Sequence, residues 1–199
     1  MPLSTMQGQA ILDMIKRIRE AARAVIDTIS ETTGIWAIPE LLPMASNDNE
    51  VTLNVPGYCQ VNTYACGAVA GLMVLKTFRP KASTDAFYRR VNPHPEHGCG
   101  TGKLIRALRR SGLGVSDRDD LTFHRLCREI DEGFPVIVVI ENPLFESSHW
   151  IVIYGYGRKP DRVFLATNGF PILNRKIVPR KDFERIWRPR GNGLVVWGW

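Results

Sequence analysis

A cysteine and a glutamine stand six residues apart in the stretch QVNTYACG, residues 60–67. The apolar run that begins at Ala65 has the pattern of a buried helix, which places Cys66 in its first turn. A thiol is a strong nucleophile only as the thiolate, and the unpaired N–H groups of a helix N-terminus favour that charge. Cys66 is therefore a candidate nucleophile, and the missing side chain of Gly67 would let a substrate approach.

Three further residues can complete the chemistry of such a thiol. His149 opens the run HWIVIYGYG, which has the composition of a strand, and its imidazole can take the thiol proton. Asn168 follows nineteen residues later, and its side-chain amide can accept from the imidazole and fix its orientation. Gln60 can supply an amide N–H to a developing oxyanion, alongside the backbone N–H of Cys66.

The elements that must position these residues change in type along the chain. Helical patterns cover residues 65–78, 84–91 (with Ser83 as cap), 102–111 and 122–132. Short β-branched and aromatic runs, bounded by Gly, Pro and Asn, follow from Pro135 to the C-terminus. Helices followed by an antiparallel sheet predict an α+β domain.

The order of these motifs resembles that of papain-like cysteine peptidases. In style it is closest to the compact bacterial branch that includes the bacteriocin-processing, double-glycine leader peptidases. The resemblance covers roughly residues 53–170 and rests on QVNTYACG, HWIVIYG and ATNG, at 60–67, 149–155 and 166–169. It implies a helical lobe that carries the nucleophile, packed against an antiparallel sheet lobe with the cleft between them.

The resemblance also implies a role for each residue: Cys66 as nucleophile, His149 as general base and acid, Asn168 as orienting group and Gln60 as oxyanion donor. The implied reaction is hydrolysis of a peptide or isopeptide bond through an acyl-enzyme. One departure is that the bacteriocin-processing branch usually has Asp followed by Pro where this chain has Asn168 followed by Gly169. Acyl transfer or deamidation by the same superfamily is an alternative, and so is a non-catalytic module that binds an acidic partner or nucleic acid.

The first 50 residues are predicted to form a separate extension. Apolar residues between Ile11 and Ile29 recur at helical spacing and predict one long amphipathic helix, which AIPELLPMASNDNE connects to the rest. The predicted division is therefore 1–50 for helix and connector and 51–199 for the peptidase domain. We expect the helix to pack on its own domain or on a second subunit; a cover over the cleft is the alternative.

Composition is that of an ordinary globular protein, with 44% hydrophobic and 23% charged residues in 199. No apolar run is long enough to span a membrane and no secretory signal is evident, so a cytoplasmic protein or an effector exported without a classical signal is expected. The four cysteines are expected to be reduced thiols. No cofactor is expected, and the oligomeric state is open.

The net charge of +6 is unevenly spread along the chain. Residues 158–190 hold ten basic side chains against three acidic ones. Such a bias can attract an acidic partner or nucleic acid, besides the peptide or protein substrate, and it can equally be a solvated surface.

The stretch NPHPEHGCGTGK, residues 92–103, resembles two binding motifs without matching either. His94, His97 and Cys99 do not have the spacing of a common zinc site. Leu104 stands where a phosphate-binding P-loop has Ser or Thr. An ordinary loop is therefore expected, without a metal.

Overall fold

An antiparallel sheet forms the centre of the computed structural model, which describes residues 37–40, 49–142, 147–159, 161–168, 175–187 and 192–198 and single positions between 13 and 32. The order of its strands is β4 (Leu113–Arg118), β9 (Gly193–Gly198), β5 (Val136–Asn142), β6 (Ser147–Arg158), β7 (Asp161–Ala166) and β8 (Arg175–Pro179). β2 (Glu50–Thr52) also pairs with β6, while β1 (Ala37–Glu40) and β3 (Gly57–Gln60) form a separate pair. The predicted α+β class is confirmed.

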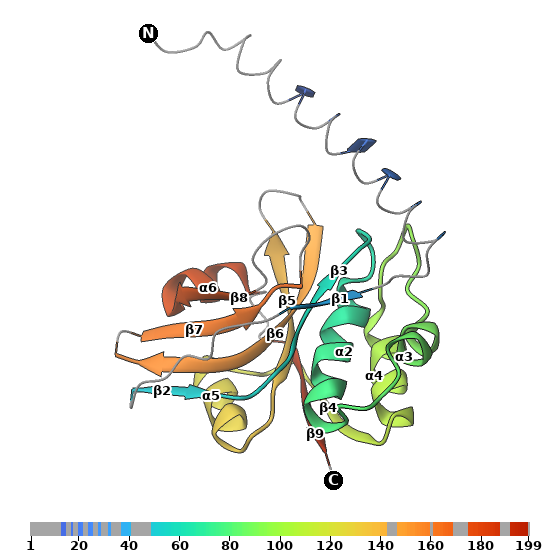
Figure 1. Cartoon of the computed structure of the whole chain (residues 1–199). Helices are drawn as coiled ribbons and strands as arrows, with labels where there is room; N and C mark the ends of the chain where they lie inside the picture. The colour runs from blue at the N-terminus through green and yellow to red at the C-terminus, as the bar shows by residue number, and fades with distance from the viewer. Residues whose placement is uncertain are drawn as a thin grey trace, which may run out of the picture.

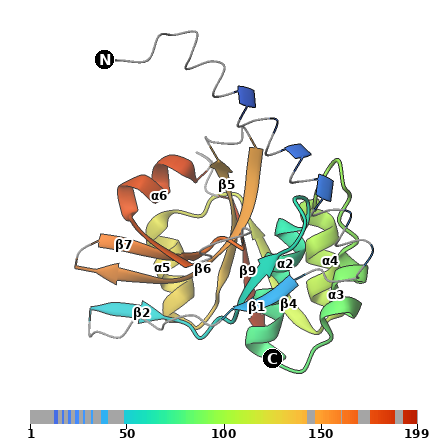
Figure 2. The same cartoon turned by 45° about the horizontal axis from the view of Figure 1, so that its top comes forward.

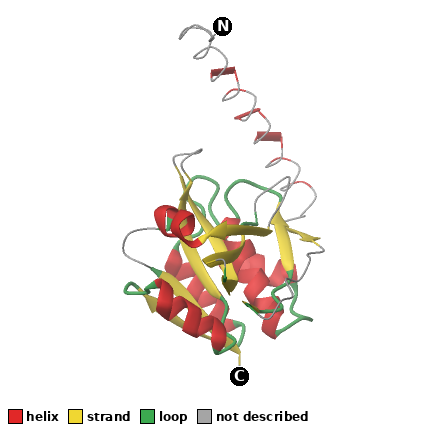
Figure 3. Ribbon diagram, turned by 90° about the vertical axis from the view of Figure 1, so that its left-hand side faces the viewer, coloured by secondary structure: helices red, strands yellow, loops and turns green. Residues whose placement is uncertain are grey.

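Helices lie on both faces of this sheet (Figure 1; Figure 3). α2 (Cys66–Phe78), α3 (Thr84–Val91) and α4 (Thr101–Arg110) pack together, and α2 lies against β6. α5 (Phe123–Asp131) and α6 (Arg180–Ile186) belong to the second apolar cluster, on the other face. Figure 2 shows the same separation of the α2–α4 group from α5 and α6.

Side chains alternate between the two faces of the sheet along each strand, which explains why helices cover both faces. Along β5, Ile137 packs in the cluster of α2, α3 and α4, whereas Val136 and Val138 pack with α5 and α6. Along β6, Val152 faces the first cluster and Ile153 the second. Because successive side chains of a strand point to opposite faces, a continuously apolar strand needs cover on both sides.

The helix predictions are confirmed to within one or two residues, including the cap of α3, where Ser83 Oγ accepts from the Ala86 N–H at 3.3 Å. The predicted order of helices first and sheet second was too simple. β4 lies between α4 and α5 yet pairs with β9, and α6 separates β8 from β9. β1 falls in the stretch predicted as a connector.

The predicted N-terminal helix falls mostly outside the described residues. The positions that are described between 13 and 32 are helical and exposed, including Met14 and Val25 of the predicted apolar face. Most of the predicted connector after β1 also lies outside the described residues. No helix in the described part has the length and apolar character needed to cross a bilayer.

Gly71 in α2 lets α3 and α4 approach closely. A Cβ there would lie 2.6 Å from Leu104 Cδ1 and 3.0 Å from Phe87 Cζ, and both side chains are almost fully buried. Gly71→Ala gains up to about 1 kcal/mol in helix propensity, but overpacking costs about 1–3 kcal/mol. We therefore expect a lower free energy of unfolding, by about 1 kcal/mol, in urea denaturation.

Gly102→Ala in α4 is the matched control. The nearest atom to its Cβ would be the exposed Arg106 Nη1, at 3.4 Å. This variant should be as stable as the unsubstituted protein or more so, and the same gain in both variants would contradict close packing at Gly71.

Candidate active site

Cys66 is the first residue of α2, and the preceding residue, Ala65, provides no side-chain cap. Ser, Thr, Asp or Asn usually stands at this position and accepts from the N–H groups of the first turn. The first turn of α2 also contains no acidic residue. The positive end of the helix dipole is therefore left to stabilise a negative charge on the Cys66 sulfur, and the residue as a whole is only 8% exposed.

His149 lies on β6, opposite Ile140 of β5, and hydrogen-bonds the Cys66 thiol. Burial raises the pKa of Cys66, but the hydrogen bond and charge of His149 lower it, as do the backbone N–H groups of Trp150 and Gly67, and the net pKa lies below the ordinary thiol value. Burial lowers the pKa of His149, but the hydrogen bond and charge of Cys66 raise it above the ordinary imidazole value. Both shifts favour a thiolate–imidazolium pair.

The second nitrogen of the imidazole is held by the main chain. His149 Nε2 is hydrogen-bonded to the carbonyl oxygen of Thr167, one residue beyond the end of β7. A carbonyl only accepts, so Nε2 carries the proton in this contact and Nδ1 is left to exchange a proton with Cys66. The Thr167 carbonyl is a functional group that no side-chain pattern in the sequence could reveal.

Asn168 is fully buried and has a left-handed backbone, with φ 47°. Its Nδ2 donates to the carbonyl oxygen of Cys66 at 2.8 Å and to that of Trp150 at 3.1 Å. Its Oδ1 has no hydrogen-bond partner within the described part of the chain, although the Asn168 side chain also helps to raise the pKa of His149. The amide thus ties the first residue of α2 to the strand that carries His149.

Gln60 ends β3, and its side chain is buried. Its backbone N–H donates to the carbonyl oxygen of Asn168 at 2.9 Å, while its Oε1 is buried without a hydrogen-bond partner in the described part. Hydrogen bonds therefore connect Gln60 to Asn168 and Asn168 to Cys66. All four residues singled out from the sequence lie together.

The space beside Gly67 is filled by protein, contrary to the expectation that it admits a substrate. A Cβ at Gly67 would lie 2.6 Å from Cys99 Cβ and 3.0 Å from Trp150 Cδ1. Trp150 Nε1 in turn donates to the Cys99 carbonyl oxygen at 3.1 Å. Gly67 is needed for this close packing, and burial together with the charge of Cys66 raises the pKa of Cys99 to about 12, which makes it a poor nucleophile.

One group among the described residues has the composition of metal ligands: His94, Glu96 and His97, all exposed, with ligand atoms within 4.8 Å of one another. His94 Nδ1 already accepts from the Glu96 N–H at 3.2 Å. Cys99, which the sequence places next to them, is buried against Gly67 instead. The loop therefore does not gather the three residues whose spacing raised the question of zinc.

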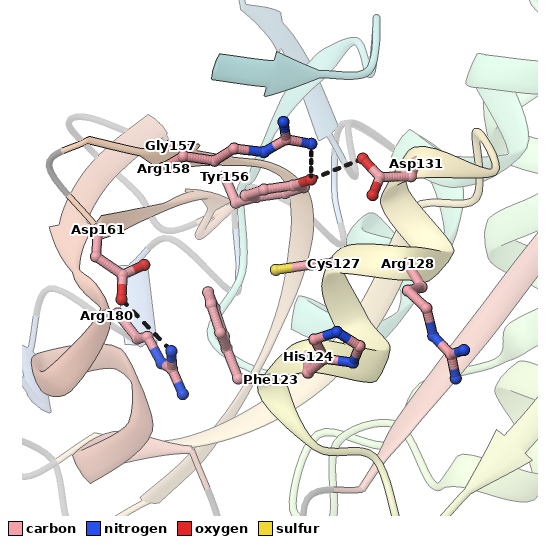
Figure 4. Close-up of a pocket in the computed structure, with 10 residues that line it drawn as sticks. All are labelled: Phe123, His124, Cys127, Arg128, Asp131, Tyr156, Gly157, Arg158, Asp161 and Arg180. Carbon is pink, nitrogen blue, oxygen red and sulfur yellow. Dashed lines mark hydrogen bonds and ion pairs between the residues drawn. The ribbon is translucent and has the colours of Figure 1, made fainter. Parts of the chain in front are cut away.

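A hollow of about 420 Å³ lies at the other end of β6, beside α5 (Figure 4). Tyr156 donates its hydroxyl proton to Asp131 Oδ1 at 2.7 Å and accepts from Arg158 at 3.1 Å. Arg180 pairs with Asp161 at one side of the hollow. The Cys127 sulfur points into it, but burial and the charge of Asp131 raise the pKa of this thiol to about 12. These groups neutralise one another, and the hollow has no reactive thiolate.

Solved structures share the fold described above, although each is less than 20% identical in sequence. A double glycine motif protease from an AMS/PCAT transporter, in complex with the leader peptide, aligns with a TM-score of 0.56 at 19% identity, over 73% of this chain and 92% of that one. The peptidase domain of Streptococcus ComA, a bifunctional ABC transporter, aligns with a TM-score of 0.59 at 16% identity, over 71% and 96%. A putative C39-like peptidase from Bacillus anthracis gives 0.61 at 15% identity, over 76% and 99%.

Sequence comparison identifies the family of the chain. No curated protein sequence matches the chain. A family model described as "Peptidase_C39 like family" matches residues 52–195, which include all four residues of the site. The chain therefore belongs to the Peptidase_C39-like family and is a papain-like cysteine protease.

Proposed function

We propose that this cysteine peptidase cleaves peptide bonds through an acyl-enzyme, with Cys66 as nucleophile and His149 as general acid and base. The observation that carries the proposal is the hydrogen bond between the two side chains at the uncapped N-terminus of α2. A base and a helix dipole acting on one thiol are the two devices that make a cysteine nucleophilic at neutral pH. The leader peptide bound to one structural neighbour supports a peptide as the substrate class.

The reaction proceeds in two balanced halves. The Cys66 thiolate attacks the substrate carbonyl carbon, and a C–S bond forms as the carbonyl oxygen becomes an oxyanion. Collapse of this intermediate breaks the C–N bond while the His149 imidazolium gives its proton to the leaving amine. Water then attacks the thioester, His149 takes its proton, and breakage of the C–S bond releases the acid and regenerates the thiolate.

Two donors are proposed for the oxyanion: the backbone N–H of Cys66 and the side-chain amide of Gln60. Gln60 is suited to the task because it is buried on a strand and its backbone is bonded to Asn168. A preorganised donor is most effective where water is excluded. In the same proposal Asn168 is a positioning residue, which holds Cys66 and β6 at a fixed separation through its two amide hydrogen bonds.

We also propose that residues 51–199 form the peptidase domain and that residues 1–50 support it. β1 pairs with β3, and its Ala37 lies opposite Gln60. Glu50 forms an ion pair with Arg162 of β7. Both contacts stabilise strands that lead to the site. Residues 1–50 therefore help to position Gln60.

The test of this function is cleavage of a proteome-derived peptide library, with new termini identified by mass spectrometry. The unsubstituted protein should produce a defined set of cuts, and Cys66→Ala should produce none. His149→Ala should cut roughly 10²–10⁴-fold more slowly, because proton transfer is lost. Cys127→Ala is the control and should retain full activity; cleavage by Cys66→Ala at the original rate would contradict the proposed nucleophile.

The role of the Asn168 amide predicts that Asp, the residue usual in the related branch, is not tolerated here. Asn168→Asp replaces Nδ2 by an oxygen that faces two carbonyl oxygens at 2.8 and 3.1 Å. Loss of buried hydrogen bonds in this way costs about 1–3 kcal/mol. We expect urea denaturation to show a decrease of that size in the free energy of unfolding.

Asn92→Asp is a closely matched control. Asn92 has nearly the same left-handed backbone, with φ 48°, but it is exposed at the end of α3. Asp tolerates this conformation about as well as Asn, so the control should not decrease the free energy of unfolding by more than about 0.5 kcal/mol. An equal decrease in the free energy of unfolding for both substitutions would contradict the proposed role of the Asn168 amide hydrogen bonds.

A further inference from the structure

A small hollow between α3 and α4 is lined by four cationic side chains. Its volume is about 220 Å³, and its walls are Arg90 from α3 and Lys103, Arg106 and Arg110 from α4. Val91 and Ala107, both buried, form its floor, with Asn92 at the end of α3. None of the described residues that line it is acidic.

Neutral groups hold two of the four cations in place. Arg90 donates to Ser111 Oγ at 2.7 Å, and Lys103 donates to the Asn92 carbonyl oxygen at 3.1 Å. Among the ion pairs between described residues, none includes Arg90, Lys103, Arg106 or Arg110. Arg90 and Lys103 are therefore preorganised without loss of their positive charge.

This arrangement costs stability when the hollow is empty of anions. Lys103 and Arg106 are three residues apart on α4, and Arg106 and Arg110 four apart, so like charges meet on one helix face. Lys103 also lies near the positive end of the α4 dipole. No acidic residue stands three or four positions from any of the three in the sequence, and Glu96 is the only acid between residues 86 and 116.

Several basic side chains elsewhere in the described part of the protein are paired with acids. In the C-terminal half, where the sequence is richest in Lys and Arg, Arg162 pairs with Glu50 and Arg185 with Asp182. Arg180, in the hollow beside α5, pairs with both Asp161 and Glu184. The α3–α4 hollow differs from the hollow beside α5, because Asp131 and Asp161 line the latter and no acidic residue is among the described lining residues of the former.

We propose that the α3–α4 hollow binds the phosphoryl groups of a soluble oligophosphate. Guanidinium groups recognise phosphate oxygens through paired, charge-assisted hydrogen bonds, and three of the four cations are arginines. The volume is below the roughly 300–1,000 Å³ of pockets that hold a drug-sized organic ligand, which fits a compact anion. The site lacks the P-loop sequence and uses side chains in place of a glycine-rich backbone.

The proposal is tested by calorimetric titration of inorganic tripolyphosphate into the full chain. We expect saturable binding that weakens as NaCl is raised, because salt screens the attraction. Arg106→Glu should weaken binding at least about tenfold, the loss expected for one charged hydrogen bond. Arg106→Gln, which keeps a polar side chain without the charge, should also weaken it, and circular dichroism should show that both variants fold.

Arg128→Glu on α5 is the matched control, since it removes an exposed helical arginine and changes the net charge equally. It should change the affinity for tripolyphosphate only slightly. The proposal is overturned if the unsubstituted protein does not bind tripolyphosphate. It is also overturned if Arg106→Glu and Arg128→Glu lose affinity for tripolyphosphate equally.

The source of the phosphoryl group is settled by a second arm with vesicles of phosphatidylcholine with and without phosphatidic acid. Binding of tripolyphosphate but not of the acidic vesicles supports the soluble ligand proposed here. Binding of acidic vesicles alone, lost in Arg106→Glu and kept in Arg128→Glu, overturns the soluble source and assigns the same site to a phospholipid headgroup.

Discussion

A negative sulfur inside the protein must be compensated by positive charge close by, and the arrangement of the site follows from this requirement. Burial alone would keep Cys66 protonated. The start of α2 supplies oriented N–H groups, and His149 supplies a proton acceptor that becomes a cation. Neither is sufficient without the other, because the helix dipole does not take the proton and an imidazole in a buried setting would itself stay neutral.

The rest of the fold keeps these two charges together. α2 belongs to the helical layer and His149 to the sheet, so their separation depends on how the layers pack. Gly67 allows Cys99 and Trp150 to approach the start of α2, and the Asn168 amide binds carbonyl oxygens on both sides of the junction. The Thr167 carbonyl then sets the orientation of the imidazole ring. The contacts that fix the geometry are thus mostly between side chains and backbone, which does not require a particular residue type at the partner position.

That distribution explains what could be predicted from the sequence. The order of Gln60, Cys66, His149 and Asn168 on recognisable elements was sufficient to predict the fold class and the family, since the resemblance rests on the identity of these side chains. Thr167 acts through its backbone, so nothing in its side chain identifies it. The close packing at Gly67 depends on Cys99, which is distant in sequence and was considered as part of a surface loop. β4 was missed because its run LGVSDR is short and its pairing with β9 is entirely long-range.

The measurement that most directly tests the charged pair is the rate of alkylation of each cysteine by iodoacetamide as a function of pH, read by peptide mass spectrometry. The structure predicts that Cys66 reacts at lower pH than an ordinary thiol, while Cys99 and Cys127, with pKa values of about 12, stay unmodified. In His149→Ala the Cys66 profile should move to higher pH, because the raising effect of burial is no longer offset by the imidazole. An unchanged Cys66 profile in His149→Ala, or the same slow reaction at all three thiols, would contradict the thiolate–imidazolium pair.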